Sequence, residues 1–176
     1  NNTGEEGSPN YFNDYGRTKY LAEQVYKKWQ EEDPENRMLV IIRPTVIFGE
    51  GNRGNVFNLL NQIASKRFVM VGSGSNTKSM AYVENVAAFI QFSTAFNNGV
   101  HIYNYIDKPD LDMNKLVSSA RKILFKKNGV GSRLQKIFAI VIGYIAELFS
   151  KITGLSLPIS SIRVKKFLST TSFSSS

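Results

Sequence analysis

The sequence predicts an α/β fold in which helices cover an open, mostly parallel sheet. One observation is residues 38–42, a short and continuous apolar run of the kind found in strands buried on both faces of a parallel sheet. A second is the segment 14–30, whose apolar side chains recur at helical spacing and would form one face packed on that sheet. The members of this face are Leu21, Ala22, Val25, Tyr26 and Trp29.

Further elements are predicted along the rest of the chain. Asn13 or Asp14 can cap the first helix, and Asp112 can cap a later one. Strands are expected at residues 68–71 and 100–105, and helices from about Asn55, from about Glu84 to Ala95, and after Asp112.

Composition limits the kinds of site that the chain can hold. The chain has no cysteine, which excludes disulfides and thiolate metal sites and suits a reducing compartment such as the cytoplasm. His101 is the one histidine, so no metal site is predicted. Residues 1–114 hold 11 Lys and Arg against 13 Asp and Glu, whereas residues 115–176 hold 11 against Glu147 alone. Such a basic end suits an anionic substrate, nucleic acid, a membrane or an acidic partner.

Tyr15 and Lys19 form the motif with the clearest chemical meaning. Residues four apart lie one above the other on a helix, so the Lys19 ammonium can approach the Tyr15 phenol. A fixed cation favours the phenolate form, which can move a hydroxyl proton. Because the chain has eight tyrosines, one such match also arises readily by chance, and the motif alone is weak.

Three later segments strengthen this motif by their order and spacing. They are Ile42-Arg43-Pro44-Thr45-Val46-Ile47-Phe48-Gly49, Gly54-Asn55-Val56-Phe57 and Met80-Ala81-Tyr82-Val83-Glu84-Asn85-Val86-Ala87. Together with Tyr15, Lys19 and Glu23, they resemble the C-terminal half of extended short-chain dehydrogenases/reductases, in the NAD-dependent epimerase/dehydratase family. The resemblance covers residues 1–125 well and the remainder loosely. It implies a Rossmann-type doubly wound sheet and NAD or NADP as cofactor.

The resemblance also implies roles for individual residues. Tyr15 and Lys19 would be catalytic and would contact the cofactor, and Pro44 and Val46 would lie along the nicotinamide ring. Asn55, Val56, Lys78 and Arg163 would be on the substrate side. Lys78 stands where nucleotide-sugar epimerases often have a diphosphate-binding arginine, and a lysine lacks the bidentate fork of that side chain. The alternative for Pro44, less favoured, is that it only ends a strand, whereas Lys78 can equally be a solvated loop lysine.

The expected domain organisation follows from what the resemblance lacks. The family's glycine-rich dinucleotide turn and its catalytic Ser or Thr have no counterpart in this sequence, so we expect a fragment that is inactive alone. Residues 1–125 would be the C-terminal part of a catalytic domain, to which 50–82 contribute substrate contacts. Residues 126–176 would form a helical, basic region on the substrate side.

The apolar stretch 137–149 leaves three interpretations open. It is shorter than the roughly 20 residues that a membrane span needs. We favour a helix buried within the domain or an oligomer, with a helix lying on a membrane as the alternative and a span as the third. The family's frequent dimers use the helix that carries Tyr15 and Lys19, so a homodimer is expected.

The sequence is compatible with three functions from different classes. The preferred one is an NAD(P)-dependent epimerase, dehydratase or reductase of a nucleotide-linked sugar, in cell-surface polysaccharide biosynthesis. The second is a dehydrogenase or reductase of an apolar ketone such as a steroid-like ring. The third is a non-enzymatic module whose basic end binds a membrane or nucleic acid. Nucleic acid is not expected, because apolar runs interrupt the basic residues and no nucleic-acid-binding module is recognised.

Overall fold

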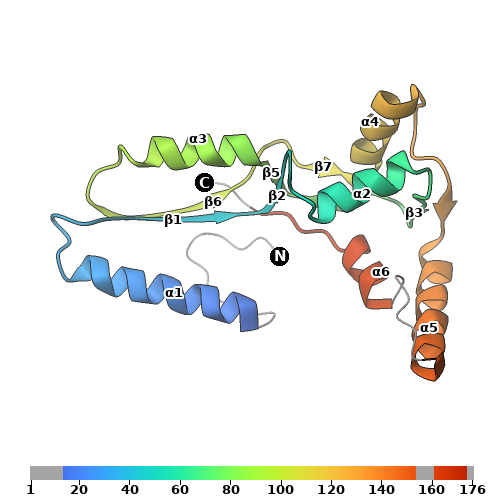
Figure 1. Ribbon diagram of the computed structural model, residues 1–176, viewed down its shortest axis with the longest axis horizontal. Helices are drawn as coiled ribbons and strands as arrows, with labels where there is room; N and C mark the ends of the chain where they lie inside the picture. The colour runs from blue at the N-terminus through green and yellow to red at the C-terminus, as the bar shows by residue number, and fades with distance from the viewer. Residues whose placement is uncertain (1–13, 154–160, 174–176) are drawn as a thin grey trace. The chain divides into compact units, whose positions relative to one another are not determined.

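The structure is a computed structural model that describes residues 14–153 and 161–173 (Figure 1). These residues form two compact units. The first unit contains residues 14–51, 79–108 and 173, and the second contains the described residues of 52–78 and 109–172.

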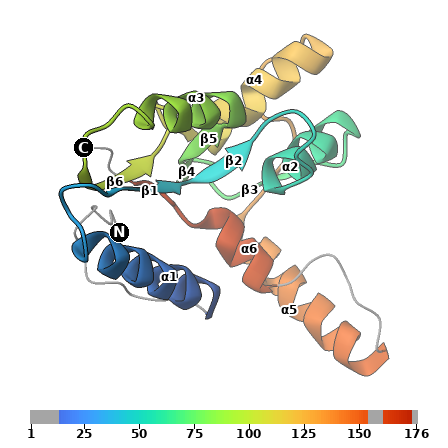
Figure 2. The ribbon, with the colours of Figure 1, turned by 60° about the vertical axis from the view of Figure 1, so that its left-hand side comes forward.

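The first unit is built on the parallel pair of β1 (Met38–Pro44) and β6 (Gly99–Tyr105). Met38 lies opposite Gly99 and Pro44 opposite Tyr105, so the two strands match over their full length. Helix α1 (Asp14–Glu31) lies on one side of this pair and α3 (Val83–Ser93) on the other (Figures 1 and 2). A shorter parallel pair joins β2 (Val46–Phe48) to β5 (Met80–Tyr82).

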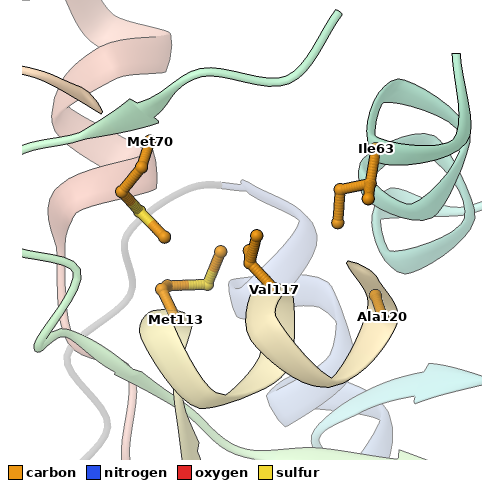
Figure 3. Packing of buried hydrophobic residues seen from close by; sticks show 5 residues of the cluster. All are labelled: Ile63, Met70, Met113, Val117 and Ala120. Atoms are coloured by element: carbon orange, nitrogen blue, oxygen red, sulfur yellow. The ribbon is translucent and has the colours of Figure 1, made fainter. Parts of the chain in front are cut away.

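The second unit combines short strand pairs with helices. β3 (Met70–Val71) pairs in parallel with β8 (Arg133–Leu134), and β4 (Thr77–Lys78) pairs antiparallel with β7 (Leu111–Asp112). Its helices are α2 (Asn55–Ala64), α4 (Met113–Phe125), α5 (Lys136–Thr153) and α6 (Ser161–Leu168). Side chains from α2, β3 and α4 form its core, namely Ile63, Met70, Met113, Val117 and Ala120 (Figure 3).

Local signals placed most helix and strand ends correctly. The Asp112 carboxylate accepts a hydrogen bond from the Lys115 amide at 2.7 Å, which confirms the predicted cap of α4. The strand expected at 68–71 is shorter than predicted. The amides of Arg67 and Phe68 both donate to the Gln62 carbonyl, and this turn keeps them out of the strand ladder.

Helix α1 faces the sheet with a different side from the one predicted. Its less exposed side consists mainly of polar side chains at helical spacing, namely Gly16, Tyr20, Glu23, Gln24, Lys27 and Gln30. The predicted apolar face, with Leu21, Ala22, Val25, Tyr26 and Trp29, is exposed instead. The prediction that this face packs on the sheet was wrong, because the contacts with β1 and the loop before it are polar ones, including an ion pair from Glu23 and hydrogen bonds from Gln30.

Helix α5 corrects a second expectation. The apolar stretch 137–149 is helical, but its large side chains are exposed, so burial within the described part of the chain was a wrong prediction. Among the described helices, none is long and apolar enough to cross a membrane.

Replacing Val117 with Ala tests the core of the second unit. Val117 is fully buried, so Val117→Ala removes apolar contacts and leaves a small cavity, which should lower the free energy of unfolding by about 2 kcal/mol. Ile123→Ala on the same helix is the control. Its side chain is 74% exposed, and the change should cost less than about 0.5 kcal/mol. Denaturant unfolding measures both, and equal losses would contradict the assignment of the core.

Candidate active site

The candidate site begins with Tyr15 and Lys19 on the first turns of α1. The Lys19 Nζ atom lies 5.6 Å from the centroid of the Tyr15 ring, as the one-turn spacing predicts. The Tyr15 side chain is 70% exposed and so accessible to another molecule. The Thr18 hydroxyl donates to the Tyr15 carbonyl at 2.9 Å, a contact within the first turn. The pair therefore presents a phenol and an ammonium together at an open surface.

The chain path brings this pair to the carboxyl end of β1. Because α1 precedes β1 and runs in the opposite direction, its first turns lie at the end where β1 finishes (Figure 1). An ion pair holds the two elements together: Arg43 Nε donates to Glu23 Oε1 at 2.9 Å and Nη2 donates to Oε2 at 2.5 Å. Since Glu23 lies one turn beyond Lys19, the pair anchors the helix next to the candidate site.

Pro44 and Val46 lie at this same end of the first unit. Pro44 closes β1 and Val46 opens β2, and both side chains are exposed. Between them, the Thr45 amide donates to the Tyr105 carbonyl at 3.2 Å, which ties the turn to β6. In open α/β sheets, ligands bind beyond the carboxyl ends of strands, so two exposed apolar side chains here fit a flat ring. Their contact with a cofactor stays a prediction.

The predicted substrate residues belong to the second unit. Asn55 and Val56 begin α2, and the N-cap residue Gly54 has no side chain to accept a hydrogen bond from the first amides of the helix. This helix start therefore leaves amide groups available to a polar ligand. Arg163 lies in α6, and its side chain is outside the described part of the structure. The substrate roles of these residues remain predictions.

Lys78 is not the solvated loop lysine that the sequence also allowed. It lies in β4, where its ammonium donates to the Ser169 carbonyl at 2.5 Å and contacts the Thr171 hydroxyl at 3.4 Å. Burial lowers the pKa of the Lys78 side chain from its usual value. Lys78 therefore fastens the segment after α6 to β4, and a contact with substrate would be an additional role.

Tyr82 and Asp107 form a cluster that sequence reasoning missed. The Asp107 carboxylate accepts hydrogen bonds from the Tyr82 amide at 2.6 Å and from the Asn85 side chain at 3.0 Å, and so caps α3. The Tyr82 hydroxyl donates to Glu50 Oε2 at 2.9 Å. Asp107 lies 25 residues after Tyr82, so no local spacing pattern reveals the cap.

The hydrogen bond to Glu50 makes Tyr82 a poor candidate for a catalytic base. It stabilises the protonated phenol and raises the pKa of Tyr82 to about 12 from 10.0. Tyr82 therefore keeps its proton at neutral pH and in the interval between those two values, and loses it as the pH rises through about 12. Tyr82 is thus a hydrogen-bond donor to Glu50 and unsuited to act as a base near neutrality.

Titration of Glu50→Gln tests this contact. Because the substitution removes the negative charge that holds the proton, the pKa of Tyr82 should fall from about 12 toward 10.0. Ultraviolet absorbance of tyrosinate, compared with the same titration of a Tyr82→Phe sample, isolates the contribution of Tyr82. The contact is refuted if the titration of Tyr82 is unchanged in Glu50→Gln.

Comparisons with known proteins extend these observations. A sequence model of the 3-beta hydroxysteroid dehydrogenase/isomerase family matches residues 2–95. The N-acetyl-alpha-D-glucosaminyl-diphospho-ditrans,octacis-undecaprenol 4-epimerase of Escherichia coli O157:H7 is 50% identical over 163 residues. The alignment covers 92% of this chain and 49% of that protein, so the chain spans about half the length of this curated relative.

Two solved structures show a similar fold. The UDP-glucuronic acid 4-epimerase of Bacillus cereus, crystallised with NAD, matches with a TM-score of 0.60 and 20% identity over 77% of this chain and 45% of its own. The UDP-N-acetylglucosamine 4-epimerase of Bacillus cereus matches with a TM-score of 0.62 and 12% identity over 77% of this chain and 46% of its own. These matches confirm the predicted Rossmann-type class.

The family match includes the helix with Tyr15 and Lys19 and the strand end at Pro44 and Val46. It covers more than half of the chain and bears out the resemblance seen in the sequence motifs. The chain therefore belongs to the 3-beta hydroxysteroid dehydrogenase/isomerase family, within the extended short-chain dehydrogenases/reductases.

Proposed function

We propose that the whole protein is an NAD(P)-dependent epimerase of a diphosphate-linked sugar, acting in the biosynthesis of a cell-surface polysaccharide. The observation that carries this proposal is the Tyr15 and Lys19 pair, exposed on α1 beside the carboxyl end of β1. The relative that is 50% identical supports epimerisation over dehydration or net reduction, because its name describes a 4-epimerase. The sequence left these three reactions open.

In this proposal, Tyr15 acts as the base, and Lys19 lies beside it on the same face of α1. Tyr15 takes the proton from a sugar hydroxyl and later returns it, with the Lys19 ammonium 5.6 Å from the centre of its ring. NAD or NADP would supply the hydride acceptor and donor. Pro44 and Val46 would lie against its nicotinamide ring, and Lys19 would also donate a hydrogen bond to its ribose.

The substrate side of the proposal rests on the second unit. Asn55 and Val56, at the start of α2, would contact the group that carries the sugar. Lys78 and Arg163 would balance the charge of a diphosphate, which both nucleotide-linked and lipid-linked sugars contain. Residues 50–82 and 126–176 would thus form the substrate region, and residues 1–125 the later part of the catalytic domain.

A steroid-like ketone is the second candidate substrate. The family description favours it, since it names hydroxysteroid dehydrogenases and isomerases. The contacts of Lys78 with Ser169 and Thr171 also favour it, because they occupy part of the hydrogen-bonding capacity of that ammonium. The same Tyr15 and Lys19 chemistry would then serve a secondary alcohol on an apolar ring.

The proposal includes a homodimer through α1 in the cytoplasm, with the protein meeting the membrane peripherally. The exposed apolar side chains of α1 support the dimer, because a second copy would remove them from water.

Tyr15→Phe is the direct test of the proposed base. The whole gene product would be assayed with NAD(H) or NADP(H) and with UDP-sugars, dTDP-sugars and diphospholipid-linked sugars, with products followed by NMR. Removing the phenolic hydroxyl of Tyr15 should lower kcat by about 10²-fold to 10⁴-fold. Tyr26→Phe is the matched control, because Tyr26 is also exposed on α1 and should leave kcat unchanged.

Two other outcomes would count against this function. If Tyr15→Phe and Tyr26→Phe retain equal activity, the Tyr15 assignment is wrong. If no diphosphate-linked sugar reacts while an apolar ketone does, and that activity depends on Tyr15, the steroid-like candidate replaces the sugar.

Arg43→Lys tests whether the ion pair positions the helix. Lysine keeps the charge but cannot donate two parallel hydrogen bonds to Glu23. A small displacement of Tyr15 should lower kcat roughly tenfold with little change in KM. Arg37→Lys is the control, since the Arg37 and Glu32 pair lies at the other end of α1. An equal effect of both substitutions on kcat would refute the positioning role.

A further inference from the structure

Helix α5 has two faces of opposite character. One face packs against α6 in the second unit, as both ribbon views show (Figures 1 and 2). Ala139 and Gly143 are buried, and their small size permits close packing. At the next position of this face, Glu147 Oε1 accepts hydrogen bonds from the Ser161 amide and hydroxyl, both at 2.8 Å. The one acidic side chain of α5 is therefore directed at α6.

The opposite face is apolar and exposed. On a helical projection at 100° per residue, its side chains cover a continuous arc of about 160° that contains no charged residue. They are Ile137, Phe138, Val141, Ile142, Tyr144, Ile145, Leu148, Phe149 and Ile152. An arc of this width matches the apolar face of a helix that lies in a membrane interface.

The charges along one edge of this arc are basic. On the helical projection Lys151 lies directly beside Tyr144, and Lys165 on α6 places its ammonium 3.2 Å from the Tyr144 hydroxyl, whereas Lys136, the first residue of α5, lies on the side of Gly143. Residues 115–176 carry 11 Lys and Arg against Glu147 alone. Near anionic lipid, each basic side chain adds attraction, and long lysine chains can reach the headgroups from the border of an apolar face.

We propose that the exposed face of α5 docks on the surface of an anionic membrane. The apolar arc enters the boundary between headgroups and acyl chains, and the flanking lysines contact acidic headgroups. A second copy of the chain is a poorer occupant. Two such faces would bring together two regions that are both strongly basic, whereas an anionic lipid surface complements their charge.

Docking would place the protein where a lipid-linked sugar is found. That link to catalysis depends on the proposed function, because the lipid carrier belongs to the name of the 50% identical relative. The membrane contact itself depends only on the exposed face of α5 and its basic border.

Vesicle sedimentation of the whole gene product tests the contact. Binding would be measured to vesicles of phosphatidylglycerol mixed with phosphatidylcholine, and to phosphatidylcholine alone. The double substitution Ile145→Ser with Ile152→Ser should weaken binding to the anionic vesicles on the order of tenfold. These side chains are 62% and 75% exposed, so the change leaves the core intact. Ile123→Ser on α4 is the matched control at 74% exposure and should leave binding unchanged.

The electrostatic part has its own pair of variants. Lys151→Gln should weaken binding to the anionic vesicles about fivefold, and added salt should reduce the difference. Lys28→Gln is the control, because Lys28 is exposed on α1, away from α5 along the chain. Equal binding of Lys151→Gln and Lys28→Gln would overturn the charge contribution.

Three results would overturn the membrane proposal. They are no binding of the wild type to either vesicle, equal binding of the α5 double variant and the wild type, and a loss of self-association in that variant without any vesicle binding. The epimerase assay is independent of these results. Vesicle binding with no activity toward any sugar would support the docking face and reject the proposed function. Activity toward a sugar with no vesicle binding would support the proposed function and reject the docking face.

Discussion

The parallel pairing of β1 and β6 is the constraint on which the first unit depends. Seven residue pairs, from Met38 with Gly99 to Pro44 with Tyr105, hold the two strands parallel over their full length. Because parallel strands finish at the same edge, the turn after Pro44 can bond to Tyr105, and the first turns of α1 lie beside it. The candidate site is therefore a consequence of strand direction.

The two helices beside this strand pair are held by contacts of different kinds. The Arg43 and Glu23 pair is partly buried, with side-chain exposures of 32% and 18%, and it turns the polar side of α1 toward β1. On the other side of the β1 and β6 strand pair, the ring centre of Phe89 in α3 lies 5.3 Å from that of Tyr103 and 5.1 Å from that of Tyr105. One helix is thus held by an ion pair and the other by aromatic packing.

The exposed apolar faces of α1 and α5 have a common physical meaning. Each contains several large side chains in contact with water, an arrangement that contributes nothing to folding and favours association. Their chemical surroundings differ. The α1 face is on a helix that carries both acidic and basic residues, which suits a second protein surface. The α5 face has a basic border, which suits anionic lipid.

The sequence alone determined the fold class, most of the elements and the Tyr15 and Lys19 pair. These features depend on local periodicity and on residues one helical turn apart, so they can be recognised from the sequence alone. The Asp112 cap was predictable for the same reason, since its partner is three residues away. The family motifs also placed Pro44 and Val46 at the end of a strand.

Only the tertiary structure decided which helix faces are covered and which distant residues meet. Glu23 contacts Arg43 across 20 residues, and Asp107 accepts a hydrogen bond from the amide of Tyr82, 25 positions earlier at the start of α3. Lys78 bonds to Ser169 across 91 residues and is partly buried, which excludes the alternative of a solvated loop lysine. Such contacts form when separate elements pack together, and packing also leaves the apolar sides of α1 and α5 exposed. Hydrophobic periodicity identifies an apolar face, and the partners available in the fold decide whether it is buried.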